Sequence, residues 1–242
     1  PAVPPPGCHR ARCNAAQAVR SLGPAAGVAF YGRAALLTLH TTLSASPSGA
    51  PADASDLVAS WVNLMLCERD LAGITRALGA LTGDSYRLVN FVRVPRAFVE
   101  GMEARIRSDD AAAQSAFTVA RTQQEELVRL QPDYGPPLCV LGLIDAGLGR
   151  KEEALREGRR ALELMPVAQD SISGSDLRAL FAVIGVWVGE KDLAFEQLAI
   201  ATRIPGTLSY GQLKLHPFWD PLRGDPRFEK ILADLAPKET SR

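Results

Sequence analysis

The sequence predicts an all-α fold, an array of antiparallel helix pairs that ends in a capping helix. Three observations carry this prediction. Aromatic residues make up only 6% of the 242 residues, Ala and Leu are abundant, and β-branched residues rarely stand together, which favours helix over strand. Four similar segments recur at a nearly constant spacing. After the last of them, the chain changes to a proline-broken aromatic turn and one short amphipathic stretch.

The first part of the chain does not fit this pattern. Residues 1–23 are rich in Pro and Arg, and we expect them to be poorly ordered. Residues 24–54 combine a marginal apolar helix, over 24–43, with a linker of Pro, Ser and Ala. The apolar stretch is internal and is interrupted by His40, so we do not interpret it as a signal peptide. The start at Pro1 suggests a processed chain or a piece of a longer protein.

The repeated segments lie within residues 55–206. When they are superimposed on their central turns, the turn positions lie 39, 41 and 40 residues apart, at Arg69, Ser108, Gly149 and Gly189. So regular a spacing indicates four copies of one unit. Each unit is predicted to be a pair of antiparallel helices joined at that turn.

Small residues at fixed places in the units indicate that the paired helices pack closely. The first helix carries a small residue where two backbones must approach. These small residues are Gly101, Gly142 and Ala182. In the second helix, the core position holds Phe117 or Leu198, with Gly158 as a weak substitute. Proline cannot continue a helix, so a proline is expected to close each second helix. The closing residues are Pro132, Pro166 and Pro205.

These features together resemble the tetratricopeptide repeat family. The best match is PPLCVLGLIDAGLGRKEEALREGRRALELMP, which has Leu141, Gly142, Gly149, Ala154, Ala161 and Pro166 in the family's arrangement. The resemblance is good over residues 95–206 and weaker over 55–85, and the period exceeds the family's usual ~34 residues. It implies a right-handed superhelical array, an α-solenoid, in which the first helices of the units line a concave surface.

Residues 207–242 are predicted to close the array. LSYGQLKLH gives one more helix, and PFWDPLRG breaks the chain and offers Phe218 and Trp219 as plugs against the last repeat. Asp225 is expected to cap a final helix that has Pro226 at its first position. This ending is similar to the ends of tetratricopeptide regions in large bacterial regulatory proteins. The chain would then be a regulatory or docking module of such a protein.

The charge balance argues against two classes of partner. Lys and Arg total 27, as do Asp and Glu, and no basic stripe is present, so we expect no binding to nucleic acid or to an anionic membrane surface. No apolar run approaches the ~20 residues of a transmembrane helix, so we expect no membrane insertion. The expected protein is soluble and, by default, cytoplasmic.

No set of metal-binding residues stands out. Cys8, His9 and Cys13 lie close together but lack a fourth ligand at a usual spacing, so we expect no metal site. Cys67 and Cys139 lie in apolar helical contexts and are expected to be buried thiols. No motif for a cofactor emerges, and none is expected.

Two serine-containing stretches invite comparison with hydrolase motifs, but neither supports a catalytic nucleophile. Gly83-Asp84-Ser85 is superficially like a hydrolase block, but it follows a predicted helix, and we expect a turn there. SISGSD lacks the spacing of a nucleophile elbow and is expected to be a loop before a helix that starts at Asp176. The alternative is a small esterase-like hydrolase on an all-α repeat scaffold, with a nucleophile that no motif reveals.

Protein binding is the preferred function. Extrapolation along the first helices predicts a concave groove lined by Asn63, Met102, Arg105, Leu143, Val183 and Trp187. This set is mostly apolar, so the expected partner is an apolar helix or an extended peptide. For Leu143 and Val183, packing in the core is an equal alternative. Residues 24–43 or a second copy of the chain are further candidates to occupy the groove, so a homo-oligomer is possible.

Overall fold

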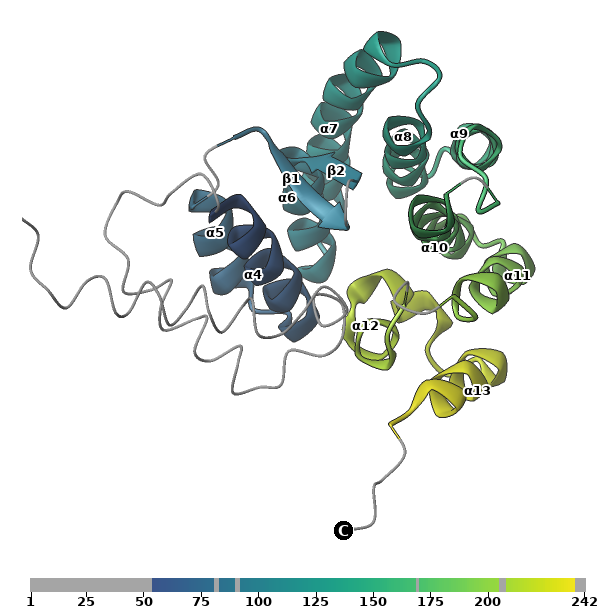
Figure 1. Cartoon of the computed structure of the whole chain (residues 1–242). Coiled ribbons are helices and arrows are strands. Elements are labelled where there is room, and N and C mark those ends of the chain that lie inside the picture. Colours follow the sequence, from purple (N-terminus) through teal and green to yellow (C-terminus); the bar gives the residue numbers. More distant parts are fainter. Residues whose placement is uncertain (1–53, 81–82, 90–91, 169, 205–207, 238–242) are drawn as a thin grey trace, which may run out of the picture. The chain divides into compact units, whose positions relative to one another are not determined.

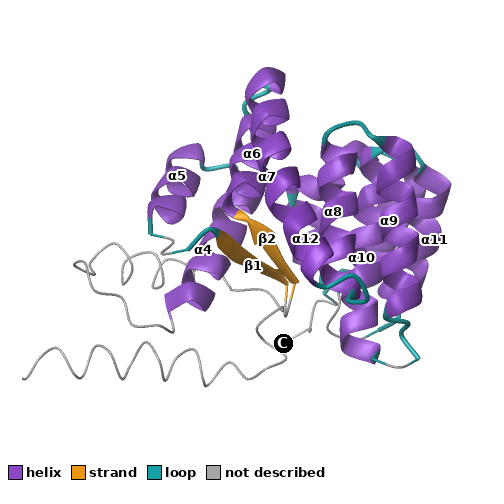
Figure 2. Cartoon of the chain, turned by 90° about the horizontal axis from the view of Figure 1, so that it is seen from above, coloured by secondary structure: helices purple, strands orange, loops and turns teal. Residues whose placement is uncertain are grey.

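The computed structural model describes residues 54–80, 83–89, 92–168, 170–204 and 208–237, all of which belong to the unit Asp53–Arg242. Helices dominate this part of the chain, as predicted (Figures 1 and 2). They are α4 (Ala54–Glu68), α5 (Leu71–Gly79), α6 (Arg96–Ile106), α7 (Asp110–Leu130), α8 (Gly135–Gly147), α9 (Lys151–Leu164), α10 (Ser171–Trp187), α11 (Lys191–Ala201), α12 (Tyr210–Leu215), the 3-10 helix η1 (Pro217–Leu222) and α13 (Pro226–Leu235). The predicted tail 1–23 and the helix 24–43 lie outside the described residues.

The four predicted turn residues share one backbone conformation. Arg69, Ser108, Gly149 and Gly189 all have positive φ, at 54°, 59°, 75° and 82°. In each turn, the amide of the next residue donates a hydrogen bond back to a carbonyl five residues earlier, at 2.8–3.0 Å. A left-handed residue followed by this long backward bond is the Schellman ending of a helix. The predicted register of all four units is therefore confirmed at the turns.

Close approach of the paired helices is also confirmed. A Cβ atom added at Gly142 in α8 would lie 2.9 Å from the Ala154 carbonyl oxygen in α9, so only glycine fits there. The prediction that Gly158 is a weak core substitute needs correction. A Cβ on Gly158 would lie 2.4 Å from the Phe181 ring, so this aromatic side chain from α10 fills the space that the glycine leaves.

A β-hairpin interrupts the helices, and the all-α prediction missed it. β1 (Ser85–Val89) pairs with β2 (Val92–Pro95) in antiparallel register, with Arg87 opposite Arg93. Along each strand, buried and exposed side chains alternate. β1 packs against α4, and β2 packs against α6, α7 and α8. Figure 2 shows the two strands (orange) among these helices.

The predicted loop SISGSD is also wrong, because these residues form the first turns of α10. The side chain of Asp170 caps the helix by accepting bonds from the amides of Ile172 and Ser173, at 3.0 and 2.9 Å. Small residues are needed in this first turn, since a Cβ on Gly174 would lie 2.7 Å from the Val167 nitrogen. Asp176 therefore lies inside the helix, where it is buried.

The last four repeat helices pack as consecutive pairs. α8 contacts α7, α9 and α10, and α10 contacts α9 and α11. Figure 1 shows these helices side by side, with α12 lying between α4 and α10. Charged side chains add to the packing where Lys151 pairs with Glu190 between successive turns. Each new pair thus covers the apolar side of the one before it.

The C-terminal prediction is confirmed in its elements. Ser209 and Gln212 form a capping box at the start of α12. Phe218 and Trp219 in η1 are buried, at 6% and 2% exposure, as predicted for plugs. Asp225 accepts a bond from the Arg227 amide at 3.0 Å and caps α13. Arg227 also pairs with Asp192 at 2.6 Å, which ties α13 to α11.

Candidate functional site

The structure places the predicted groove residues in different environments. Met102, Leu143 and Val183 are buried, at 2%, 0% and 1% exposure, and so belong to the core. No partner can touch them unless the fold opens. Asn63 is used internally: it donates to the Leu88 carbonyl at 3.4 Å and accepts from the Tyr86 hydroxyl at 2.8 Å. Its role is to hold the hairpin on α4.

Arg105 and Trp187 are the two predicted residues that the fold brings together. The guanidinium carbon of Arg105, on α6, lies 4.1 Å from the ring centroid of Trp187, at the end of α10. A cation over an indole face is attracted by the ring quadrupole. Burial lowers the pKa of Arg105, while the carboxylates of Asp110 and Asp220 oppose this shift. The cation is therefore held in a site that also favours a carboxylate.

An aromatic cluster surrounds this pair. The Trp187 ring stacks on Phe98 with centroids 6.4 Å apart and lies 6.4 Å from Phe117. Phe218 meets Trp187 edge-on at 5.4 Å and Phe98 at 6.3 Å. Offset and edge-to-face contacts at these distances are the favourable arrangements of aromatic rings. The cluster joins α6, α7 and α10 to η1, so it draws on segments far apart in the sequence.

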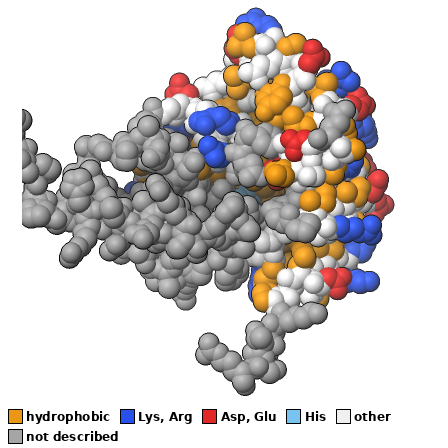
Figure 3. Space-filling model, in the orientation of Figure 1, with side chains coloured by type: hydrophobic (Ala, Val, Ile, Leu, Met, Phe, Trp, Pro, Cys, Tyr) orange, Lys and Arg blue, Asp and Glu red, His pale blue; other side chains and the backbone are white. Residues whose placement is uncertain are grey.

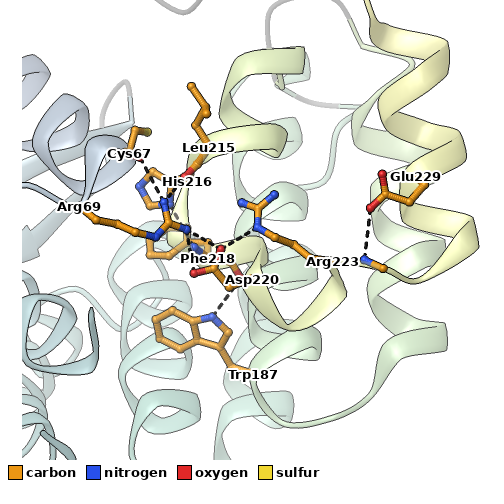
Figure 4. A network of polar contacts seen from close by, with 10 residues as sticks. Cys67, Arg69, Trp187, Leu215, His216, Phe218, Asp220, Arg223 and Glu229 are labelled. Atoms are coloured by element: carbon orange, nitrogen blue, oxygen red, sulfur yellow. Dashed lines mark hydrogen bonds and ion pairs between the residues drawn. The ribbon is translucent and has the colours of Figure 1, made fainter. Parts of the chain in front are cut away.

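Residues Ser209–Arg223, which we call the closing segment, are fixed over this cluster by polar contacts (Figure 4). The Trp187 indole N–H donates to the Phe218 carbonyl at 3.2 Å. Arg69 donates to both carboxylate oxygens of Asp220, at 2.7 and 2.9 Å, and to the Leu215 carbonyl at 3.2 Å. A guanidinium that engages both oxygens of a carboxylate is a geometrically specific contact. The closing segment is therefore held through its main chain and one acidic side chain.

His216, the N-cap residue of η1, stays neutral. Its Nδ1 accepts a hydrogen bond from the Phe218 amide at 3.3 Å, and the two rings lie 4.1 Å apart. Burial lowers the pKa of His216 to about 3; the nearby Arg69 charge adds to this shift, and the Asp220 charge opposes it. If Nδ1 carried a proton, its N–H would point at the N–H of the Phe218 amide, and two donors would face each other. Neutral imidazole is thus part of the docked geometry.

Cys67 lies beside this site without the character of a nucleophile. Its thiol is half-buried rather than fully buried as predicted, and its carbonyl accepts a bond from Arg69 at 3.2 Å. Burial raises the pKa of this thiol to about 11, so the reactive thiolate is scarce at neutral pH. Cys139 is fully buried, as predicted, and its pKa is raised to about 12. Neither thiol is activated.

The serine motif GDS belongs to the hairpin. Ser85 is the first residue of β1, and its hydroxyl accepts a hydrogen bond from Arg93 Nε at 3.1 Å. Arg93 also donates to the Ser85 carbonyl at 3.1 Å. These contacts fix the hairpin end, and the partner of the Ser85 hydroxyl is a cationic arginine rather than the general base that a catalytic serine needs.

A second polar cluster is buried between α7, α8 and α9. Asp145, with no exposed surface, accepts from Arg121 Nε at 2.6 Å. Its other carboxylate oxygen and Oε2 of the buried Glu157 have no conventional donor among the described residues. Burial, as the largest cause, and the neighbouring Asp145 together raise the pKa of Glu157 to about 8. One proton shared between the two carboxyl groups satisfies both orphan oxygens.

Two further features limit the chemistry of the described residues. No three of their His, Cys, Asp or Glu side chains converge as ligands for a metal ion. Cys8, His9 and Cys13 lie outside this part of the chain. No helix within the described ranges combines the length and apolar character that crossing a bilayer requires.

Comparisons with known proteins add no relative. No protein-family model, no curated protein and no solved structure matches this chain.

Sequence reasoning found Arg105 and Trp187 and expected Phe218 to plug the last repeat, but it missed the contact between Arg69 and Asp220. Arg69 had been assigned only the role of a turn residue, and Asp220 had no role at all. One signal was available: arginine stands where glycine is expected in a left-handed turn. A bulky residue at such a position implies that its side chain is needed.

Proposed function

We propose that this chain is a non-enzymatic, tetratricopeptide-like scaffold that binds a segment of another protein around Trp187 and Arg105. One observation carries the proposal: the chain's own closing segment is held there by contacts that a segment of another protein with the same groups could also make. They are main-chain carbonyls, one aromatic ring and one carboxylate. Such contacts recognise peptides in general, since the carbonyls give affinity and the side chains give selectivity.

The charges at the site refine the expected partner. The sequence predicts an apolar helix or an extended peptide as the ligand, because the predicted groove residues are mostly apolar. Arg69 and Arg223 both bond Asp220 in the closing segment, at 2.7 and 2.8 Å from its Oδ1. A partner with a carboxylate next to its apolar part therefore fits better than one with apolar groups alone.

Two further considerations support a scaffold. The shifted pKa values of Cys67, to about 11, and His216, to about 3, each favour the neutral form, the reverse of an activated cysteine–histidine pair. On the face shown in Figure 3, acidic, basic and hydrophobic side chains are interspersed, without the single-sign field that nucleic acid attracts. The resemblance to bacterial regulatory proteins suggests a docking role in a larger assembly.

A peptide-display experiment tests the proposal. Random peptides would be selected on the immobilised full chain, and their affinities measured for the wild type and two single variants. Arg105→Ala removes a cation at the site, whereas Arg160→Ala removes one from α9 that pairs with Glu163 at 3.0 Å on an exposed surface. We expect selected peptides to lose about tenfold in affinity on Arg105→Ala, the loss of one charge-assisted contact.

The matched control decides the outcome. Arg160→Ala should leave the affinities unchanged within error, because that side chain lies on another surface. If the two variants weaken the peptides equally, or neither does, the binding site is not around Trp187. Circular dichroism of both variants checks that the fold is retained.

A further inference from the structure

The closing segment resembles a bound peptide in the way it is seated. Its receptor residues come from the ends of two first helices, where Arg69 follows α4 and Trp187 ends α10. The closing segment itself comes after the repeats, so receptor and occupant are separate parts of the chain. Arg69 and Asp220 are 151 positions apart in the sequence. The receptor is therefore complete without the segment that fills it.

The backbone of Arg69 points to a specific use of its side chain. With φ at 54°, this residue adopts a conformation that is unfavourable for any residue with a Cβ atom. The same turn position in the last two units is glycine, with φ at 75° and 82° at Gly149 and Gly189. Arg69 stands at this position in the first unit, and its guanidinium reaches the closing segment. An observed conformational outlier of this kind supports a functional role.

The ion pair between Arg69 and Asp220 is partly exposed to solvent. The side chains of Arg69 and Asp220 are 38% and 43% exposed, and Leu215 is 44% exposed. A second carboxylate can therefore reach the Arg69 guanidinium without unfolding of the repeats. An ion pair at this degree of exposure is individually weak, so the cost of displacing the closing segment lies mainly in its buried side chains, among them Leu213, Phe218 and Leu222.

We infer that the closing segment is an internal ligand that competes with an external protein segment of the same chemistry. The external segment would carry an aromatic side chain followed two residues later by a carboxylate, as Phe218 and Asp220 are spaced here. The aromatic ring packs on Trp187 and Phe98, the carboxylate binds Arg69, and the intervening carbonyl accepts from the Trp187 indole. This inference rests on the proposed function and names its ligand class and its regulation.

A labelled peptide of residues 209–223 tests the inference on the full-length chain. Its affinity would be measured by fluorescence anisotropy for the wild type and for two variants that break the same internal contact from opposite sides. Asp220→Asn weakens the internal ligand and leaves the receptor intact. Arg69→Ala breaks the same ion pair but damages the receptor.

The two variants must differ if the closing segment is a ligand. We expect the Asp220→Asn chain to bind the peptide about fivefold more tightly than the wild type, because its competitor has lost one surface ion pair. The Arg69→Ala chain should gain nothing, because the peptide loses the same contact. A control peptide that carries both Phe218→Ser and Asp220→Asn should bind all three chains with the same affinity.

Two results would overturn the inference. One is that the peptide binds none of the chains while all keep the wild-type circular dichroism. The other is that Asp220→Asn and Arg69→Ala bind it equally, as a purely structural ion pair predicts. Either result leaves the proposed function standing if display-selected peptides still respond to Arg105→Ala. If the affinity of display-selected peptides does not change on Arg105→Ala, the proposed function itself is wrong, which is a separate result.

Discussion

In the turns that follow α8 and α10, glycine occupies the left-handed position, whereas Arg69 and Ser108 occupy it in the turns that follow α4 and α6. The backbone conformation is the same in all four, with φ from 54° to 82°. Capping of the helix that follows each turn also differs. Asp70 and Asp109 accept a hydrogen bond from the first turn of that helix with their side chains, whereas Arg150 and Glu190 form no such side-chain cap. The fold dictates the turn, and each half of the chain stabilises it in a different way.

The packing of the two halves differs as well. Helices α8 to α11 contact one another directly as successive pairs. In the N-terminal half, β1 packs against α4 and β2 against α6, and the closing segment reaches α4 through α12. The C-terminal pairs contact each other directly and also meet β2 at α8 and η1 at α10, whereas the hairpin strands lie against the first helices of both N-terminal pairs. This contrast yields four predictions.

The largest expected effect is at the junction of the halves. Phe117 has no exposed surface and lies against the glycines of both neighbouring helices, with its ring 2.7 Å from a Cβ added at Gly101 and 3.1 Å from one at Gly147. We expect Phe117→Ala to lower the free energy of unfolding by about 3–5 kcal/mol, measured by urea denaturation. Leu198→Ala, at the equivalent position of the last unit, should cost about 2–4 kcal/mol. A smaller loss for Phe117→Ala than for Leu198→Ala would contradict the assigned role of Phe117.

Acid should act on the N-terminal half first. The pKa of His216 is lowered in the folded chain to about 3, so its contribution to stability is complete above the unfolded pKa of ~6.5. As pH falls from there towards 3, the unfolded chain takes up a proton that the folded chain does not. Each pH unit in this window costs up to about 1.4 kcal/mol.

Comparison of the wild type with His216→Asn isolates this contribution, because asparagine can still accept at the start of η1. Hydrogen exchange should show α4 and η1 losing protection on acidification before α8 and α9 do. Identical acid sensitivity of wild type and variant would contradict the prediction.

A third, smaller effect concerns Glu157 and Gln197, which occupy the same position in successive units, eight residues after Gly149 and Gly189. Gln197 accepts a bond from Arg178 at 2.8 Å, whereas Glu157 has a pKa raised to about 8 by burial and by Asp145. An acid with a raised pKa stabilises the fold only while it is protonated. Stability should therefore fall as pH rises from about 4.5 to about 8.

Replacement of Glu157 by Gln should remove this pH dependence. At pH 8, we expect the variant to be more stable than the wild type by about 1–2 kcal/mol, since it keeps a buried polar group without a charge. At pH 5 the difference should shrink. Thermal melting at the two pH values measures both, and a variant less stable than wild type at pH 8 would refute the shared-proton arrangement.

The smallest effect is at the turns themselves. Ser108→Gly should raise the free energy of unfolding by about 0.5–1 kcal/mol, because glycine adopts positive φ without strain. Gly149→Ala should lower it by about 1 kcal/mol; a Cβ there meets nothing within 4 Å, so the cost comes from the backbone alone. Chemical denaturation of both variants measures the pair. The two changes in the free energy of unfolding must have opposite signs. Changes of the same sign would show that the two turns are not equivalent.

Much of the fold follows from local sequence signals. The spacing of Arg69, Ser108, Gly149 and Gly189 gave the turn register, and Asp225 with Pro226 gave the last helix. The hairpin was missed although its signal was present: Tyr86, Leu88, Val92 and Val94 alternate with exposed residues at period two. The expectation of a continuous repeat overrode that alternation. Helix α10 was started too late because Ser and Gly are poor helix formers.

The candidate site was predicted in part. The repeats placed Arg105 and Trp187 on first helices that line one groove, and the fold brings them within 4.1 Å of each other. Phe218 was expected to plug the last repeat, and it packs on Trp187. No local pattern could show that Asp220 meets Arg69, because 151 positions separate the two residues. Met102, Leu143 and Val183, expected in the groove, are buried in the core, because α6, α8 and α10 each pack against several other elements.

The bond between Arg69 and Asp220 also sets an order of events during folding. Contacts within a helix pair join residues close in sequence and form early, whereas a closure across 151 positions must wait for everything between them. During synthesis, the repeats leave the ribosome before residues 216–222 do. The aromatic site around Trp187 is then briefly uncovered. If the site binds an external segment as proposed, a partner that arrives in that interval meets no internal competitor, and the timing of translation then influences which segment occupies the site.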